Sequence, residues 1–176
     1  MPTALPPSGK PLISEEQIRA RIATLGQQIS ADLAEKKETV LLTVADGALI
    51  FSADLSRALS IPIYMDQIAV SSYEGTASSG NIKLRTEPRL NLTGKNILLV
   101  DDILDTGQTI SYLISYLEQF KPERIYICVM LDKPDGRKVP VKADYIGFEV
   151  PDRFVIGYGM DYDGLYRNLS SIFCLD

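Results

Sequence analysis

Three aspartates lie close together in the segment NILLVDDILDTGQTI, residues 96–110, where a run of aliphatic residues ends. They are Asp101, Asp102 and Asp105, and a short polar run follows them: Thr106, Gly107, Gln108 and Thr109. Small residues between a strand and a helix can present backbone N–H groups to a phosphate, and the helix dipole favours the same anion. Carboxylates this close together repel one another unless hydroxyl groups or cations bind them. The segment therefore predicts a ligand that carries a phosphate together with hydroxyl groups or hydroxyl-bound Mg²⁺.

Ribose 5-phosphate has both parts of such a ligand. Its phosphate would occupy the loop at residues 106–109, and its diol would face Asp101 and Asp102. Asp105 then remains beside the anomeric carbon, where a further carboxylate indicates proton transfer. The loop is not a nucleotide P-loop, because the pattern G-x-x-x-x-G-K-[ST] is absent. A strand end or a plain turn explains each residue taken alone, and only the whole arrangement favours the ligand.

The composition excludes several kinds of site. The chain contains no histidine, so a Ser-His-Asp triad, a Cys-His pair and a histidine-bearing zinc site cannot be built. Acid–base chemistry must use carboxylates, lysine or tyrosine, and the expected metal is a hard cation on oxygen ligands, which indicates Mg²⁺. The formal net charge of −5 argues against nucleic acid as a partner.

The cysteines and the apolar runs predict a cytoplasmic protein without a membrane segment. Cys128 and Cys174 form no CxxC pattern, which favours a reducing compartment and packing roles over a disulfide. No apolar run reaches the length that spans a bilayer. Residues 1–12 lack a charged segment followed by an apolar one, so we expect a mobile N-terminal tail rather than a signal peptide.

The elements that must position these residues alternate between helices and strands. Ser14 and Gln17 fit a capping box, and apolar residues at helical spacing follow from Ile18 to Leu33. Helical spacing recurs at residues 49–59 and 110–120. Strands are predicted at residues 39–46, 61–73, 96–102, 124–131, 143–150 and 154–159. Solid apolar strands separated by helices indicate an α/β fold, a mostly parallel twisted sheet with helices on both faces.

The same fold class locates the functional edge of the sheet. In such folds ligands bind beyond the carboxyl ends of the strands. The residues expected there are Asp46, Asp101, Asp102, Asp132 and Lys133. Residues 74–81, EGTASSGN, are small and polar, which is typical of a mobile loop.

The motif ILLVDDILDTGQTI resembles the 5-phosphoribosyl-1-pyrophosphate (PRPP) motif of type I phosphoribosyltransferases, and Asp105 resembles the hypoxanthine-guanine branch. Four further segments are similar to this family in the same order: ISEEQIRARIATLGQQI, SSYEGTASSGNIKLR, LDKP and PDRFVIGYGMDYDGLYRNL. The resemblance implies the type I phosphoribosyltransferase fold as one domain at residues 13–176. A small hood would be formed by the N-terminal segment and by about residues 145–176.

The resemblance also implies an activity, in purine salvage, with PRPP and a 6-oxopurine base as substrates and Mg²⁺ as cofactor. A ring nitrogen of hypoxanthine or guanine would displace pyrophosphate from C1 of PRPP to give IMP or GMP. Asp105 would be the general base and acid at the purine, and Asp101 and Asp102 would bind the ribose hydroxyls directly or through Mg²⁺. The 5-phosphate would be held by Thr106, Gly107, Gln108 and Thr109.

Further residues match the family's base and pyrophosphate sites. Lys133 would donate to the exocyclic oxygen of the purine, Phe154 would stack on its ring, and the Val155 backbone with Arg153 nearby would bind the other edge. The pyrophosphate side would be formed by Asp46, Gly47, Arg167 and a Mg²⁺ on Asp161. Ser72 and Tyr73 would lie on a lid over the reaction. The resemblance suggests a homodimer or homotetramer.

Three positions depart from the family pattern. Asp46 stands where lysine is usual, which opposes a polyanion in the pyrophosphate loop. Asp101 replaces a more usual glutamate, and Gln108 replaces a frequent lysine. A regulatory protein that binds PRPP or purines without turnover is the remaining alternative. A response-regulator receiver would need more residues after Asp102, and an RNA-binding attenuator of the same fold is opposed by the acidic charge.

Overall fold

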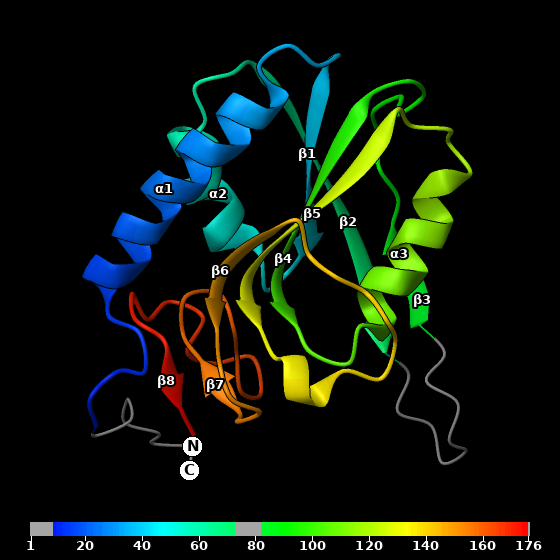
Figure 1. The fold of residues 1–176 in the computed structure, drawn as a ribbon. Helices are drawn as coiled ribbons and strands as arrows, with labels where there is room; N and C mark the ends of the chain where they lie inside the picture. The colour runs from blue at the N-terminus through cyan, green and yellow to red at the C-terminus, as the bar shows by residue number, and fades with distance from the viewer. Residues whose placement is uncertain (1–8, 73–81, 176) are drawn as a thin grey trace.

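The computed structural model describes residues 9–72 and 82–175, and its centre is a six-stranded sheet (Figure 1). The strand order is β3-β2-β1-β4-β5-β6. The bounds are β1 (Thr39–Ala45), β2 (Ile63–Ser72), β3 (Ile82–Thr86), β4 (Asn96–Leu104), β5 (Arg124–Asp132) and β6 (Tyr145–Glu149). Every neighbouring pair is parallel except β3, which is antiparallel to β2 at the edge. The mostly parallel sheet predicted from the apolar runs is confirmed.

Strand β4 lies at the centre of the sheet, between β1 and β5. Leu99 of β4 is level with Leu42 of β1 and with Ile127 of β5. Because the strands are parallel and in this register, their carboxyl ends reach the same edge of the sheet. The strand expected at residues 96–102 continues to Leu104, so the acidic pair lies within β4 rather than at its end.

Helices cover both faces of the sheet, as predicted. α1 (Glu15–Leu33) and α2 (Leu49–Ala58) pack on one face, and α3 (Gln108–Glu118) covers the other (Figure 1). Successive strand residues point to opposite faces, so Leu98 packs in the layer of α1 and α2 whereas Leu99 packs beneath α3. The expected capping box of Ser14 and Gln17 starts α1. In the described part of the chain no helix is long and apolar enough to cross a membrane.

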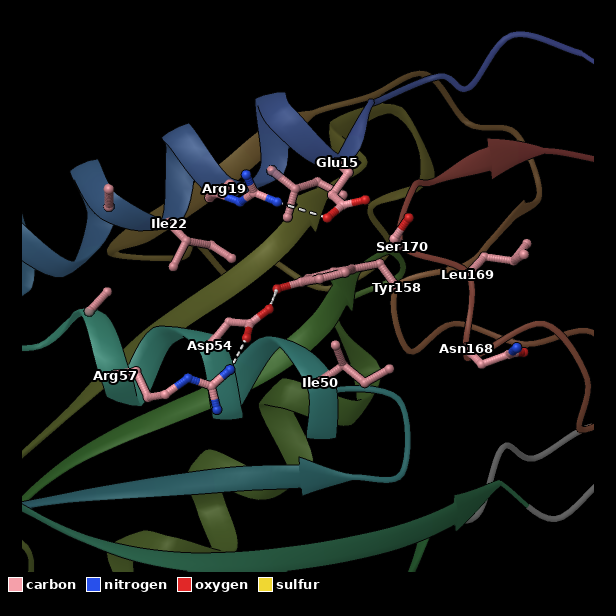
Figure 2. A pocket seen from close by; sticks show the side chains of 13 residues that line it. Glu15, Arg19, Ile22, Ile50, Asp54, Arg57, Tyr158, Asn168, Leu169 and Ser170 are labelled. Carbon is pink, nitrogen blue, oxygen red and sulfur yellow. Dashed lines mark hydrogen bonds and ion pairs between the residues drawn. The ribbon is translucent and has the colours of Figure 1, made fainter.

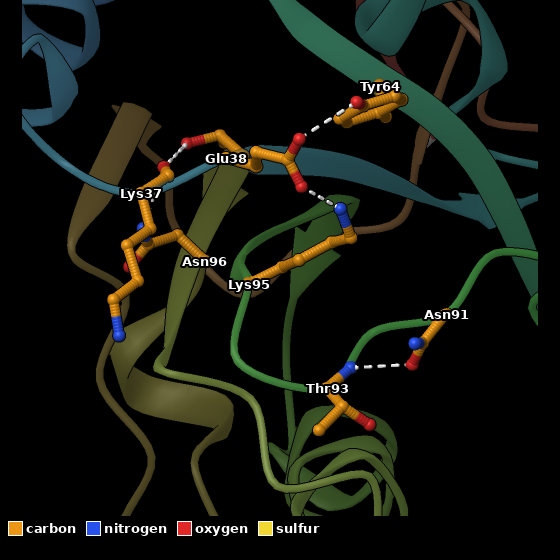
Figure 3. Close-up of polar contacts among 8 residues, drawn as sticks. Lys37, Glu38, Tyr64, Asn91, Thr93, Lys95 and Asn96 are labelled. Atoms are coloured by element: carbon orange, nitrogen blue, oxygen red, sulfur yellow. Dashed lines mark hydrogen bonds and ion pairs between the residues drawn. The ribbon is translucent and has the colours of Figure 1, made fainter.

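Polar contacts fix the amino ends of the strands, opposite the aspartates (Figure 3). The Glu38 carboxylate accepts hydrogen bonds from the Tyr64 hydroxyl, at 3.0 Å, and from the Lys95 ammonium, which also lies over the Tyr64 ring. The Asn96 side chain donates to the Lys37 carbonyl at 3.0 Å. These contacts hold the segments that precede β1 and β4 together, which stabilises the pairing of the two strands.

A second sheet of two strands lies beyond the carboxyl ends of the main sheet (Figure 1). β7 (Val155–Ile156) and β8 (Phe173–Cys174) are antiparallel, and Ile13 forms an antiparallel bridge with Ile172. The segment before α1 and the C-terminal segment are therefore held together next to the functional edge. Both cysteines are free thiols, and Cys128 is buried in β5.

The strand predicted at residues 154–159 was wrong in its length. It ends at Ile156, because Gly157 and Gly159 have φ angles of +95° and +100°, a backbone conformation that does not continue a strand. Strands β3 and β8 were not predicted, since β3 has no continuous apolar run and β8 is only two residues long. The loop predicted at residues 74–81 lies outside the described residues.

Replacing Gly26 by alanine should destabilise the fold. Gly26 is in α1, and a Cβ there would lie 2.5 Å from the carbonyl oxygen of Ala58, the last residue of α2. The two helices must separate to admit it, so we expect a loss of about 1–3 kcal/mol in the free energy of unfolding. Urea denaturation measures this loss. Gly9→Ala is the matched control, because nothing lies within 4 Å of its Cβ position. Equal stability of the two variants would contradict this packing.

Candidate active site

The two adjacent aspartates lie near the carboxyl end of β4, and their carboxyl groups interact with each other. Asp101 is 5% exposed, and one of its carboxylate oxygens accepts a hydrogen bond from the Asp102 N–H at 2.9 Å. Asp102 lies against Gly47, in the loop between β1 and α2, where a Cβ would be only 1.9 Å from Asp102 Oδ2. Glycine at position 47 therefore leaves the space that the Asp102 carboxylate occupies.

Burial raises the pKa of both carboxyl groups. For Asp101 the removal from water is the largest cause, the charge of Asp102 adds to it, and the pKa lies well above its usual value. Burial also raises the pKa of Asp102, while its hydrogen bonds and the charge of Arg167 oppose the rise. Such a pair is stabilised by a cation or by hydroxyl donors, so these oxygens fit a Mg²⁺ ion or a sugar diol.

Gly47 also contacts the segment that follows β7. Gly159 has a φ of +100°, and a Cβ there would lie 2.1 Å from the Gly47 carbonyl oxygen. Beside this contact the Tyr158 hydroxyl donates to Asp54 of α2 at 2.6 Å, at the pocket between α1, α2 and residues 158–170 (Figure 2). Burial raises the pKa of Tyr158, which keeps its hydroxyl a donor. The C-terminal segment is therefore fixed to α2.

Asp161 and Arg167 form an ion pair in this segment. Arg167 Nη2 is 2.8 Å from Asp161 Oδ1, and Arg167 Nη1 donates to the Gly159 carbonyl at 2.6 Å. The other Asp161 oxygen accepts the Gly164 N–H at 2.8 Å. Both side chains are about one third exposed, so they remain accessible to a ligand. Asp46 is exposed and follows a cis peptide bond from Ala45.

The predicted phosphate loop is held by residues 137–139. The Thr106 carbonyl accepts the N–H groups of Lys138, at 2.9 Å, and Val139, at 3.0 Å. Gly107 precedes α3 with a φ of +83°, and a Cβ there would lie 2.9 Å from the Val139 carbonyl oxygen. Gln108 and Thr109 begin α3, so the loop lies at a helix N-terminus as predicted.

Lys133 connects the end of β5 with Asp105. Its ammonium is 3.4 Å from Asp105 Oδ2 and 3.7 Å from Asp152 Oδ1, and Lys133 is 5% exposed. A Cβ at Gly136 would lie 2.4 Å from Asp105 Oδ1, so glycine is needed beside this carboxylate as well. Two carboxylates lie beside the buried ammonium, which can also donate to a carbonyl group of a ligand.

The predicted base-binding residues begin beside this pair, because Asp152 contacts Lys133 and residues 153–155 follow it. Phe154 is 53% exposed, and its ring meets that of Tyr162 edge to face with centroids 5.8 Å apart. Val155 is buried in β7. The exposed Phe154 ring is available for stacking on a planar ligand.

The structure does not test the predicted lid. Ser72 ends β2, and nothing is described of its side chain. Tyr73 lies outside the described residues. The lid role of both residues stays a prediction.

Three side chains of the site were not predicted: Arg137, Asp152 and Tyr162. Arg137 donates to the backbone carbonyls of Leu104 and Asp105, and a sequence pattern gives no signal for such contacts between distant segments. Asp152 and Tyr162 lie within the C-terminal motif, whose neighbouring residues were named, so that motif could have indicated them.

Comparison with known proteins agrees with this geometry. The family model described as "Phosphoribosyl transferase domain" matches residues 13–163. A hypoxanthine-guanine phosphoribosyltransferase of Mycobacterium tuberculosis is 42% identical over 94% of this chain and 85% of its own length, and one of Bacillus subtilis is 43% identical over 93% and 91%. A crystal structure of a hypoxanthine-guanine phosphoribosyltransferase from Bacillus anthracis has a TM-score of 0.90 at 40% identity, covering 96% of this chain and 99% of that one.

The chain belongs to the phosphoribosyltransferase family, whose fold is the α/β sheet described above. Within this family it is similar over most of its length to the hypoxanthine-guanine phosphoribosyltransferases, as the acidic motif ending in Asp105 predicted.

The raised pKa of Asp101 predicts that the unliganded protein loses stability as the pH rises. A carboxyl group whose pKa is higher in the folded chain contributes most stability below its unfolded pKa, and this contribution is lost as the pH rises through the folded pKa. Asp101→Asn removes the charge, so the variant should be more stable than the wild type at about pH 8, and the gain should vanish near about pH 4.

Urea unfolding of the ligand-free protein at both pH values measures this difference. Asp163→Asn is the control, because Asp163 is exposed and its charge is solvated. A stability difference between Asp101→Asn and the wild type that is the same at both pH values would contradict a titrating buried carboxyl.

Proposed function

We propose that this protein is a purine-salvage enzyme that transfers the 5-phosphoribosyl group from PRPP to hypoxanthine or guanine, giving IMP or GMP and pyrophosphate. The observation that carries the proposal is the contact of Lys133 with Asp105, directly before a glycine-containing loop at the start of α3. This arrangement offers a hydrogen-bond donor for a 6-oxopurine, a carboxylate for its proton and a phosphate site within one stretch of the sheet edge. The similarity to named hypoxanthine-guanine phosphoribosyltransferases supports the same reaction.

The reaction joins a purine ring nitrogen to C1 of PRPP while the bond from C1 to pyrophosphate breaks. Asp105 accepts the proton that the purine loses, and the bound ammonium of Lys133 donates to the exocyclic oxygen. Since Lys133 lies beside Asp105 before the base binds, both groups are placed on the same side of the base. Phe154 stacks on the purine ring, and the Val155 backbone and Arg153 bind its other edge.

The ribose and its phosphate occupy the neighbouring positions. Asp101 and Asp102 bind the ribose hydroxyls, directly or through Mg²⁺, and Thr106, Gly107, Gln108 and Thr109 hold the 5-phosphate at the N-terminus of α3. When bound, Mg²⁺ supplies positive charge that neutralises the pyrophosphate oxygens. Asp161 would hold a second Mg²⁺ beside the pyrophosphate, because its carboxylate is only partly buried and remains accessible.

The pyrophosphate side contains Asp46, one of the three positions at which this chain departs from the family. Gly47 and Arg167 can donate to the leaving group, whereas the exposed Asp46 carboxylate repels it. Ser72 and Tyr73 close over the substrates and exclude water. Their closure would protect PRPP from hydrolysis.

The remaining assignments concern the whole chain. One domain at residues 13–176 follows an N-terminal tail, and the bridge between Ile13 and Ile172 with the pair β7–β8 supports a hood over the sheet edge. The protein acts in the cytoplasm as a homodimer or homotetramer. Nucleic acid is not a partner, consistent with the net charge of −5.

The Asp105→Asn variant tests the catalytic assignment. Purified wild-type protein with PRPP and Mg²⁺ should form IMP from hypoxanthine or GMP from guanine. Asparagine cannot take up the proton, so kcat should fall by about 10²- to 10⁴-fold while the Kd for the nucleotide product stays nearly constant. Assays against hypoxanthine, guanine, xanthine, adenine and uracil define the base preference. Tight PRPP binding without product from any 6-oxopurine would indicate a regulatory protein instead.

The Lys133→Ala variant tests the base site. Loss of a charged donor to the exocyclic oxygen should raise the KM for hypoxanthine by about 10- to 100-fold, corresponding to about 1.5–3 kcal/mol, and leave the KM for PRPP closer to its wild-type value. Lys138→Ala is the matched control, because Lys138 is exposed and donates to Thr106 only through its backbone. Unchanged KM values for every 6-oxopurine would remove Lys133 from the base site.

A further inference from the structure

We propose that Arg137 is the positioning residue of the phosphate loop. Its guanidinium fixes the peptide units after β4 so that backbone N–H groups point to the phosphate of PRPP and Asp105 is held in place. This inference rests on the proposed function, because it assigns to the same site the residue that orders it.

The Arg137 guanidinium is bound to four acceptors. Nε donates to the Asp105 carbonyl at 2.9 Å, and Nη2 donates to the Leu104 carbonyl at 3.2 Å. Nη1 donates to the Val141 carbonyl, and Nη2 also pairs with the Asp132 carboxylate. The side chain is 17% exposed. Only arginine presents several N–H donors in a rigid planar group, so lysine could satisfy only part of this set.

These acceptors lie at the ends of β4 and β5, in the first residue after β4, and in the loop that precedes β6. Leu104 and Asp132 are the last residues of β4 and β5 and are paired in the sheet, and Val141 precedes β6. The guanidinium therefore links the first turn after β4 to the rigid centre of the sheet. Gly107 lies against the same arginine, because a Cβ there would be 3.1 Å from Arg137 Cδ.

The direction of the carbonyl groups decides the direction of the N–H groups. The peptide bonds of this loop are trans, so each C=O and the N–H of the same peptide unit point in opposite directions. Since the Asp105 carbonyl faces Arg137, the Thr106 N–H points away from it. The Thr106 carbonyl faces the N–H groups of Lys138 and Val139, so the Gly107 N–H points the same way.

Neither of these two N–H groups donates to an acceptor among residues 9–72 and 82–175. They precede the N-terminus of α3, where the helix dipole favours an anion. If the Asp105 peptide rotated, its carbonyl oxygen would point at the phosphate and repel it. Arg137 prevents this rotation without touching the ligand, which distinguishes it from the residues that bind the phosphate directly.

The test compares Arg137→Lys and Arg137→Gln with the wild type. Misorientation of the loop should raise the KM for PRPP by about 10- to 100-fold, more for glutamine than for lysine, while the KM for hypoxanthine changes by less than about threefold. A direct titration with Mg²⁺ and PRPP in a calorimeter should show the same loss in Kd. Arg19→Gln is the matched control, because Arg19 is 75% exposed on α1 and pairs with Glu15 one helical turn away.

Each outcome has a distinct meaning. If the wild type turns over and both variants keep its KM and Kd for PRPP, Arg137 does not position the loop. If both variants unfold, or if they lose kcat and thermal stability while the KM and Kd for PRPP stay unchanged, Arg137 only stabilises the fold. Either result overturns the inference. If the wild type binds PRPP without turnover, the proposed function fails, and the calorimetric comparison still decides the role of Arg137. If the wild type does not bind PRPP, both fail.

Discussion

The central position of β4 is the constraint on which the site depends. This strand pairs with β1 on one edge and β5 on the other, and its residues 97–100 are fully buried between the layers of α1 with α2 and of α3. Its register cannot slip, because a shift of one residue would exchange the faces of every side chain. The fixed register places Asp101 and Asp102 at the point where the strand reaches the functional edge.

The acidic pair is costly for the unliganded fold and favourable for a ligand. Burial raises the pKa of both carboxyl groups; a backbone hydrogen bond opposes the rise at Asp101, and hydrogen bonds with the charge of Arg167 oppose it at Asp102. A cation and sugar hydroxyls stabilise the ionised carboxylates, which the protein alone does only in part. This stabilisation contributes to the free energy of ligand binding. Glycines at positions 47 and 136 leave room for the carboxylates of Asp102 and Asp105.

One short segment, residues 133–137, contacts both the side chain and the backbone carbonyl of Asp105. Lys133 contacts its carboxylate and Arg137 contacts its carbonyl, and the single 3₁₀ turn at Pro134–Gly136 separates these two cations. The side chain and the backbone of Asp105 are thus fixed independently. The proton-transfer group and the N–H groups of the phosphate loop therefore share a support, although they act on different parts of PRPP and the base.

The sequence alone determined the fold class, the elements that carry the site and the order of its motifs. Apolar runs and helical spacing report which residues must be buried, and burial is the strongest local signal. Only the tertiary structure decided that Asp102 meets Gly47, that Gly159 meets Gly47, and that Arg137 holds the carbonyls after β4. Each of these contacts joins segments far apart in the chain, and at least one of its two sides is backbone, which every residue possesses. No residue type records them in advance, so they appear only when packing brings the segments together.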